Sequence, residues 1–112
     1  MPNNVKFIHD GDSIDYTPGA AVQAGDVIVQ GDLIGVAKRD IAANSLGALA
    51  VRGVFDFPKA TGASTAIASG ASVYWNAGSG VATTTASGNK LIGKTVRAAA
   101  DADATVRVRL SQ

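Results

Sequence analysis

The stretch of this sequence that most resembles a chemical site lies at residues 88–95. Its residues, Gly-Asn-Lys-Leu-Ile-Gly-Lys-Thr, fit the Walker A pattern G-x-x-x-x-G-K-[ST]. In a phosphate-binding loop of this kind, backbone N–H groups surround the phosphates, the lysine reaches the β- and γ-phosphates, and the hydroxyl binds magnesium. The pattern raises the hypothesis of a nucleotide-binding protein in which Lys94 and Thr95 hold the nucleotide.

The residues around this octapeptide do not provide the structure that a phosphate-binding loop needs. Such a loop follows a buried strand and opens a helix whose N-terminus faces the anion. Residues 82–87 are polar, and Val96 and Arg97 extend a β-like run that begins at Leu91. A magnesium-binding Asp on a later core strand is also missing, because Asp56 precedes the motif. We therefore expect Leu91–Arg97 to form a strand and the protein to bind no nucleotide.

The other polar clusters do not have the spacing of a catalytic or metal site. His9, Asp10, Asp12 and Asp15 lie close together in the sequence, but not with the spacing of an EF-hand loop, and an exposed turn accounts for them. His9 is the only histidine, and no Gly-x-Ser-x-Gly sequence supplies a nucleophile. We expect a protein without enzymatic activity, cofactor or bound metal.

Composition narrows the class of protein further. The chain has 112 residues, which suits a single β domain over 1–112, and it has no cysteine for disulfides or thiolate metal sites. All nine acidic residues are Asp, which favours turns and caps over helix interiors. A net charge of +1 gives no general electrostatic reason to bind nucleic acid or a membrane. Because it has neither a visible signal peptide nor an apolar run of membrane-spanning length, the protein is expected to be soluble and made in a cytoplasm.

Short β-like runs recur between turns rich in Gly, Asp, Asn and Ser. In the last run, Val106, Val108 and Leu110 alternate with Arg107 and Arg109, so one face is expected to be buried. The pattern predicts an all-β fold: a small sandwich or barrel of short antiparallel strands with little helix. The expected strands are Val5–Ile8, Ile14–Thr17, Val27–Val29, Leu33–Lys38, Leu46–Phe55, Ser72–Trp75, Gly80–Thr85, Leu91–Arg97 and Ala104–Leu110. Short helices are expected only at Asp40–Ser45 or Ala98–Ala104.

A weak internal repeat predicts two similar β units. Residues 23–29 (QAGDVIV) correspond to residues 68–74 (ASGASVY), and residues 33–35 recur as residues 91–93, both Leu-Ile-Gly. Each unit then has a strand carrying Val-Arg, at residues 51–52 and 106–107. The first unit has Val36 and Ala37 where the second has Lys94 and Thr95, which indicates that the strand, not the Lys-Thr pair, is the shared feature.

Two surface features of the second unit leave alternatives open. Arg107 and Arg109, with Lys94 and Arg97, form a basic stripe if their strands are neighbours. The stripe is either a solvated strand face or a contact with an acidic partner surface. Tyr74 and Trp75 are adjacent, so only one of them faces the core, and the other covers an edge or an interface.

Taken in order, segments spread over nearly the whole chain resemble the capsid cement (head decoration) proteins of tailed bacteriophages. The similar segments are residues 10–22 (DGDSIDYTPGAAV), 25–29 (GDVIV), 33–37 (LIGVA), 47–59 (GALAVRGVFDFPK), 70–75 (GASVYW) and 103–110 (DATVRVRL).

The resemblance implies a structural phage or prophage virion protein that binds and stabilises the capsid exterior. It implies the major capsid protein of a phage head as partner, a homo-oligomer with a trimer favoured, and a place on the capsid surface after synthesis in the bacterial host cytoplasm. Members of the family have also been labelled predicted recombinases. One alternative is therefore a nucleotide-binding, recombinase-like protein that uses residues 88–95, and another is an adaptor on a different phage assembly such as a tail. The family has no catalytic motif to transfer to this chain.

Two regions are the candidate contacts with the capsid or with other subunits. The first is a possible N-terminal arm over residues 1–7, which is short, polar and precedes the first turn; the alternative is a strand of the domain with a frayed tip. The second is the exposed side of the last strand. The contact residues expected in these two regions are Asn3, Asn4, Val5, Lys6, Phe7, Arg107 and Arg109.

Overall fold

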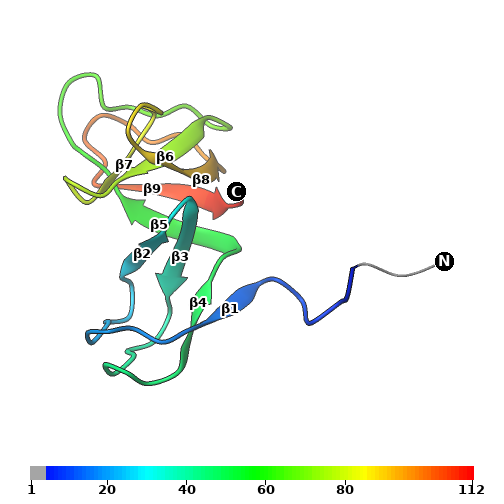
Figure 1. Cartoon of the computed structure of the whole chain (residues 1–112). Coiled ribbons are helices and arrows are strands. Elements are labelled where there is room, and N and C mark those ends of the chain that lie inside the picture. The colour runs from blue at the N-terminus through cyan, green and yellow to red at the C-terminus, as the bar shows by residue number, and fades with distance from the viewer. Residues whose placement is uncertain (1–4) are drawn as a thin grey trace.

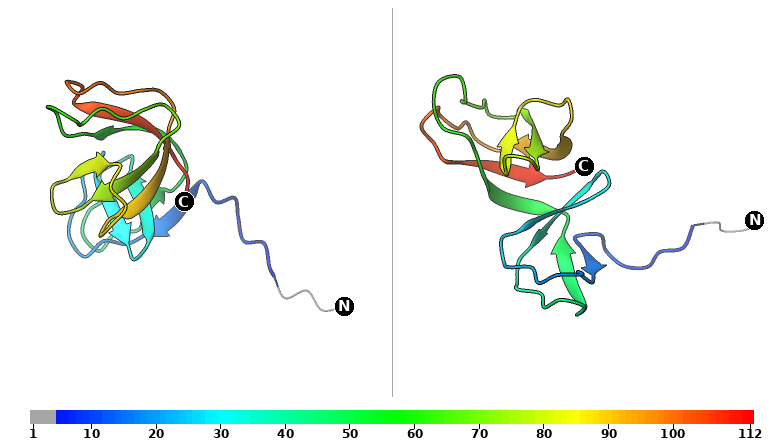
Figure 2. Two further views of the ribbon diagram at one scale, coloured as in Figure 1. Left: turned by 90° about the horizontal axis from the view of Figure 1, so that it is seen from above. Right: turned by 60° about the vertical axis from the view of Figure 1, so that its left-hand side comes forward.

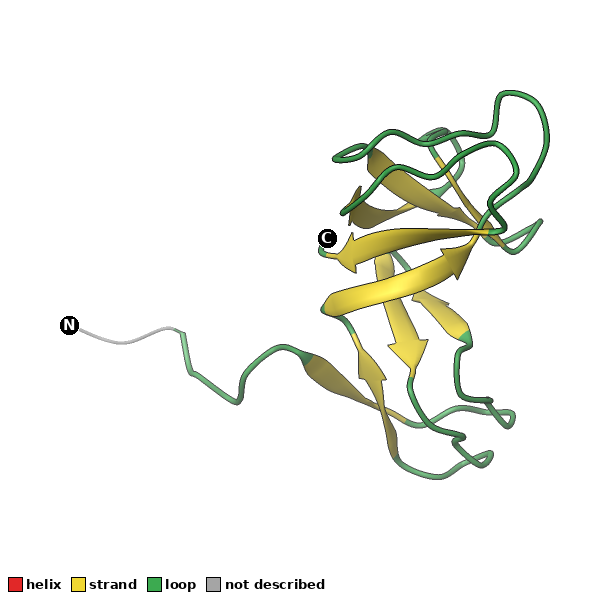
Figure 3. Cartoon of the chain, turned by 180° about the vertical axis from the view of Figure 1, so that it is seen from behind, coloured by secondary structure: helices red, strands yellow, loops and turns green. Residues whose placement is uncertain are grey.

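The computed structural model describes residues 5–112, and all regular secondary structure in this range is β-strand (Figure 1 and Figure 3). Within residues 5–112, nine strands form two antiparallel sheets. The four-stranded sheet contains β1 (Ser13–Tyr16), β2 (Val27–Gln30), β3 (Leu33–Ala37) and β4 (Gly47–Ala50). The five-stranded sheet contains β5 (Gly53–Pro58), β6 (Ser72–Asn76), β7 (Val81–Thr83), β8 (Lys90–Thr95) and β9 (Thr105–Leu110). The predicted all-β class with short antiparallel strands is confirmed.

The two sheets repeat one strand arrangement. The spatial order is β1-β4-β3-β2 in the first sheet and β5-β9-β8-β6-β7 in the second, so β7 is the only addition among the described strands. In the first unit Val22 and Ile41 exchange two backbone hydrogen bonds just outside β2 and β3, and in the second Ile67 and Ala99 do the same outside β6 and β8. The predicted pair of similar β units is confirmed.

The register corrects the last part of the predicted repeat. Val36 pairs with Ala50, and Lys94, the residue that corresponds to Val36, pairs with Arg109. Ala50 therefore corresponds to Arg109, and the alignment of residues 51–52 with residues 106–107 is wrong. Both stretches contain Val-Arg, but the strand pairing with β3 and β8 shows that they do not occupy equivalent positions in the two units.

Most of the core lies on the inner face of the five-stranded sheet. Phe57, Trp75, Ile92 and the alternating apolar residues of β9 form its centre, and Ile34 and Val36 of β3 pack into it from the other sheet. A smaller cluster of Val22, Ala37, Ile41 and Leu49 belongs to the first unit. Because neighbouring residues of a strand point to opposite faces, Val36 and Ala37 place these two clusters on opposite sides of the four-stranded sheet. Trp75 faces the core and Tyr74 does not, which confirms that only one of the pair is inside.

Two of the predicted strands are wrong. Val5–Ile8 pairs with no strand of the described residues and is not regular structure. The predicted strand Leu46–Phe55 is two strands, β4 and β5, which belong to different sheets. Gly53 has φ +129°, a conformation that an L-residue rarely adopts, and this position lets the chain turn from one sheet to the other. The other seven predicted strands agree with the structure to within two residues at each end.

Both predicted short helices are also wrong. Asp40–Ser45 and Ala98–Ala104 each contain one residue, Ile41 or Ala99, that pairs in an isolated antiparallel bridge. A bridge requires extended backbone, and a helix this short gains too few hydrogen bonds to offset the cost of starting it. The bridges therefore override the helical preference of the alanines.

Candidate functional site

The Walker-like residues form an interior strand of a sheet. β8 (Lys90–Thr95) lies between β9 and β6 and is paired with both. The chain bends at Val96 and Arg97, with no helix after the motif. The prediction that this segment is a strand is confirmed, although it ends at Thr95 instead of Arg97. The segment therefore lacks the helix N-terminus that faces the phosphate in a phosphate-binding loop.

The hydroxyl of Thr95 has a structural partner on each side. Thr95 is 4% exposed. Its Oγ1 donates to the carbonyl of Ala68 at 2.6 Å and accepts from the N–H of Ala71 at 3.0 Å. The direct hydrogen bond between Ala71 N–H and Ala68 O is long, 3.4 Å, so the hydroxyl bridges a widened turn. It is not free to bind a magnesium ion without giving up this role.

The N-terminal segment projects away from both sheets. The described residues 5–10 are exposed and irregular, and both views in Figure 2 show this segment leading outward from the body. Val5, Phe7 and Ile8 are 89%, 77% and 72% exposed. These values are high for large apolar side chains, and concentrated exposed apolar surface marks an interaction site. Asn3 and Asn4 belong, like Val5, Lys6 and Phe7, to the predicted contacts with the capsid or other subunits, but they lie outside the described residues.

Strand β5 gives the two arginines of the predicted basic stripe different neighbours. Arg107 lies opposite Asp56 on β5 and binds it in a bidentate pair, with Nε–Oδ1 at 2.9 Å and a second bond at 3.1 Å. The Arg107 hydrogen bonds hold the pKa of Asp56 below its ordinary value, and the positive charge of Arg97 adds a smaller effect. Arg109 lies opposite Val54 and is exposed. The two arginines therefore share a face, but only Arg109 is left available to a partner.

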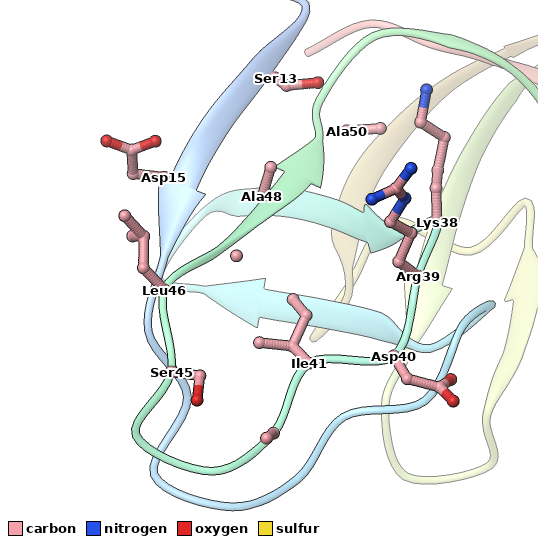
Figure 4. Close-up of a pocket in the computed structure, with 12 residues that line it drawn as sticks. Ser13, Asp15, Lys38, Arg39, Asp40, Ile41, Ser45, Leu46, Ala48 and Ala50 are labelled. Carbon is pink, nitrogen blue, oxygen red and sulfur yellow. The ribbon is translucent and has the colours of Figure 1, made fainter.

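A groove on the four-stranded sheet was not predicted. It has a volume of about 600 Å³ and is lined by residues of β1, β4 and the loop between β3 and β4. Figure 4 shows Asp15 and Leu46 on one side, Lys38 and Arg39 on the other, and Ala48 on the floor. The small residues of Gly47–Ala50 are the only sequence signal for this groove, and in the sequence they read as ordinary strand residues.

A buried lysine was also missed. Lys59 is buried, and its Nζ donates to the carbonyls of Ala60 (2.7 Å) and Asp103 (3.1 Å), with Thr65 Oγ1 at 3.3 Å and Asp101 O at 3.5 Å. Its role is to hold the loop after β5 against the loop before β9. Two of its acceptors, the carbonyls of Asp101 and Asp103, lie more than 40 positions later in the sequence. A local sequence pattern therefore does not reveal the arrangement.

The described residues were also predicted to contain no metal site, and the histidine and the acidic side chains bear on this. In residues 5–112 no group of three His, Cys, Asp or Glu side chains is placed to hold a metal ion. The exposed His9 ring contacts the carbonyl of the adjacent Asp10. This range also contains no helix with the length and apolar character to cross a membrane.

The described chain is thus a small two-sheet β protein whose distinctive features are surfaces: a projecting apolar segment, a shallow groove and a partly unpaired basic face. Comparison with protein families gives this class a more specific description. A family model described as Phage cement protein matches residues 8–110, and the chain belongs to this family. Searches of curated proteins and of solved structures found no match. The family membership implies a structural, capsid-associated role, and the suspected resemblance to capsid cement proteins is confirmed.

Proposed function

We propose that this protein binds the exterior of a phage or prophage head and stabilises it, with the major capsid protein as its partner. The observation that carries the proposal is the family match over residues 8–110, which extends over both sheets. Residues 1–112 act as one domain, with residues 1–7 as an arm. The protein is made in the bacterial host cytoplasm and functions on the capsid surface as a homo-oligomer, of which a trimer is the favoured form.

The exposed apolar segment supports this proposal. Val5 and Phe7 have no apolar neighbours to cover them in the described chain, and burying a side chain of this kind contributes about 1.5–3 kcal/mol. An extended segment also has free backbone groups that can pair with a strand edge of another protein. In a trimer, three such arms would act together, and several weak contacts on one lattice give firm attachment. Asn3, Asn4, Lys6 and Arg109 are the polar contacts in this proposal, and Arg107 contributes mainly through its pair with Asp56.

Co-sedimentation with purified expanded heads of the encoding phage tests the proposal. We expect the wild-type protein to co-sediment in large, regular copy number and to have the mass of a trimer by light scattering. The double variant Val5→Ser/Phe7→Ser should lose most of this binding. Leu46→Ser is the control, because Leu46 is a large apolar side chain that is also mostly exposed (71%) but lines the groove.

The same experiment separates the competing assignments. Failure of the wild-type protein to co-sediment with heads at any salt concentration overturns the proposal. If the protein then co-sediments with purified tails, the adaptor hypothesis replaces it.

A further inference from the structure

A row of four residues crosses the outer face of the five-stranded sheet. The ladder places Val54 opposite Arg109, Arg109 opposite Lys94, and Lys94 opposite Ser72. All four belong to neighbouring strands and point away from the core, because their sequence neighbours Phe55, Val108, Thr95 and Val73 face inward or are buried. The row therefore brings two cations side by side in the middle of an open sheet face.

This arrangement places two like charges at opposite ladder positions with no carboxylate paired to either in the described residues. Like charges directly opposite each other on antiparallel strands are destabilising. In the described residues neither Lys94 nor Arg109 takes part in an ion pair. Arg107, two residues before Arg109 on the same face, has its charge balanced by Asp56. The fold thus has a way to neutralise a cation on this face and does not use it at Lys94 and Arg109.

The repeat shows what the same surface does in the other unit. Ser13, Ala50, Val36 and Val27 form the corresponding row across the four-stranded sheet. There Val36 is buried in the main core and Val27 packs against it, so the row is the surface by which the first unit packs on the second. In the second unit the four equivalent residues are exposed in the part of the chain that the structure describes.

The space beside the two cations suits an anionic group. A hollow of about 370 Å³ lies on this face and is lined by Lys94 and Arg109 together with Ser72, Tyr74, Leu91, Ser111 and Gln112. The Gln112 amide is bonded to the backbone of Ile34, so the two serine hydroxyls and the Tyr74 phenol are the neutral polar groups of the lining that suit a ligand. Lysine and arginine make strong, charge-assisted hydrogen bonds to carboxylates, and arginine can bind both oxygens of one group. The exposed apolar side chains of Val54, which lies opposite Arg109 and is 54% exposed, and of Leu91 in the lining add the apolar contact area typical of a protein interface.

We propose that the face around Lys94 and Arg109 is a docking surface for an acidic segment of a partner protein, whose Asp or Glu carboxylates bind between the two cations. A protein partner fits better than nucleic acid because the net charge is only +1 and Asp56 lies beside the row. This inference rests on the proposed function in that the capsid is the natural source of such a segment.

An NMR titration tests the docking surface directly. The ¹⁵N-labelled protein is titrated with an Asp-rich octapeptide at low and at high salt, with inorganic phosphate and a short DNA duplex as competing probes. We expect peptide-induced shifts at residues 72, 94, 109 and 111 that weaken at high salt. Arg109→Gln should lower peptide affinity about tenfold, the usual effect of removing one charged hydrogen-bonding partner.

Arg107→Gln is the matched control, because it removes the same charge from the same strand and face but breaks an existing ion pair. It should leave peptide affinity within about twofold of wild type, as expected for a paired cation. Lys94→Gln should weaken peptide binding without lowering the urea midpoint, since it removes one of two like charges at opposite positions of β8 and β9. Equal losses of affinity in Arg107→Gln and Arg109→Gln would overturn the inference, as would tighter binding of the DNA duplex or of phosphate at this face.

Head co-sedimentation distinguishes this inference from the proposed function. If wild type binds heads and Arg109→Gln binds as well as Arg107→Gln at every salt concentration, the docking surface is refuted and the cement function stands. If wild type binds no heads but the peptide titration behaves as expected, the cement function is refuted and the docking surface stands.

Discussion

Replacing Thr95 by valine tests whether the end of the Walker-like segment serves the fold or a nucleotide. Valine has nearly the shape of threonine, so the substitution removes the hydroxyl without opening a cavity. The lost hydrogen bonds are those to Ala68 O at 2.6 Å and from Ala71 N–H at 3.0 Å. After the change, the Ala68 carbonyl keeps only the long contact with Ala71 N–H at 3.4 Å.

The expected cost follows from this geometry. A buried neutral hydrogen bond contributes about 1 kcal/mol, and a buried carbonyl left without a good donor costs about 1–3 kcal/mol. Thr95→Val should therefore lower the free energy of unfolding by about 2–3 kcal/mol. This is a large share of the ~5–15 kcal/mol that stabilises a typical domain. With a urea slope of about 2 kcal/mol per molar, the middle of the usual range, the midpoint should fall by roughly 1–1.5 M.

Urea unfolding followed by tryptophan fluorescence is the assay, because Trp75 is buried in the main core. Thr95→Ser, which keeps the hydroxyl, is the control and should lose less stability than Thr95→Val. Each protein is also unfolded with ATP and magnesium, since a ligand that binds only the folded state raises the midpoint. An unchanged midpoint in Thr95→Val would refute the structural role of the hydroxyl. A rise with ATP and magnesium that disappears in Lys94→Gln would restore the nucleotide hypothesis.

Three further predictions concern other parts of the fold. Lys59→Met keeps the apolar stem but leaves three part-buried carbonyls without their charged donor, so the free energy of unfolding should fall by about 2–4 kcal/mol, measured by urea unfolding; an unchanged midpoint would contradict the role of Lys59 in holding the two loops together. Gly93→Ala should reduce soluble, folded protein far more than Gly35→Ala, as measured by circular dichroism, because its new Cβ would overlap the backbone carbonyl of Arg109 on β9, whereas that at Gly35 would lie 2.9 Å from the Leu49 side chain, a milder clash; equal effects would argue against the close approach. Asp56→Asn should cost stability at neutral pH and progressively less in acid: the pKa of Asp56 is lowered below its ordinary 3.8 when folded, so the stability it contributes is present above that pH and is lost as pH falls through the lowered pKa. A stability difference between wild type and Asp56→Asn that does not shrink in acid would contradict the role of the pair with Arg107.

Local patterns predicted most strands of this fold, whereas long-range contacts decided the parts that they missed. The alternation in β9 and the glycine turns are local signals, and the predicted strands there agree with the structure. The break between β4 and β5 falls at Val51 and Arg52, within a run that is otherwise apolar or glycine, and the sequence does not show that Gly53 adopts a positive φ. The alanine-rich segments at Ile41 and Ala99 read as helix because their bridge partners are distant in sequence.

The candidate site depended on register in the same way. Arg107 and Arg109 are equivalent in the sequence pattern, and both were predicted as contacts. Their difference comes from β5, which places Asp56 opposite one and Val54 opposite the other. A shift of the register by two residues would exchange their roles, and composition or periodicity does not fix such a shift. The projection of Val5 and Phe7 likewise depends on the absence of a pairing strand in the described chain.

The repeat also explains why a phosphate-binding pattern occurs in a β-strand. Gly93 corresponds to Gly35, and at both positions a side chain would collide with the neighbouring strand, so glycine follows from close packing. Lys94 corresponds to Val36, which is buried against the other unit, and it is polar because its own face is open. Thr95 corresponds to Ala37, and its hydroxyl bridges a turn that is wider than the one in the first unit, where the equivalent bond from Asp26 N–H to Gln23 O is 3.1 Å. Gly93, Lys94 and Thr95 are therefore each explained by different structural surroundings. No shared ligand is needed to explain why these three residues occur next to one another.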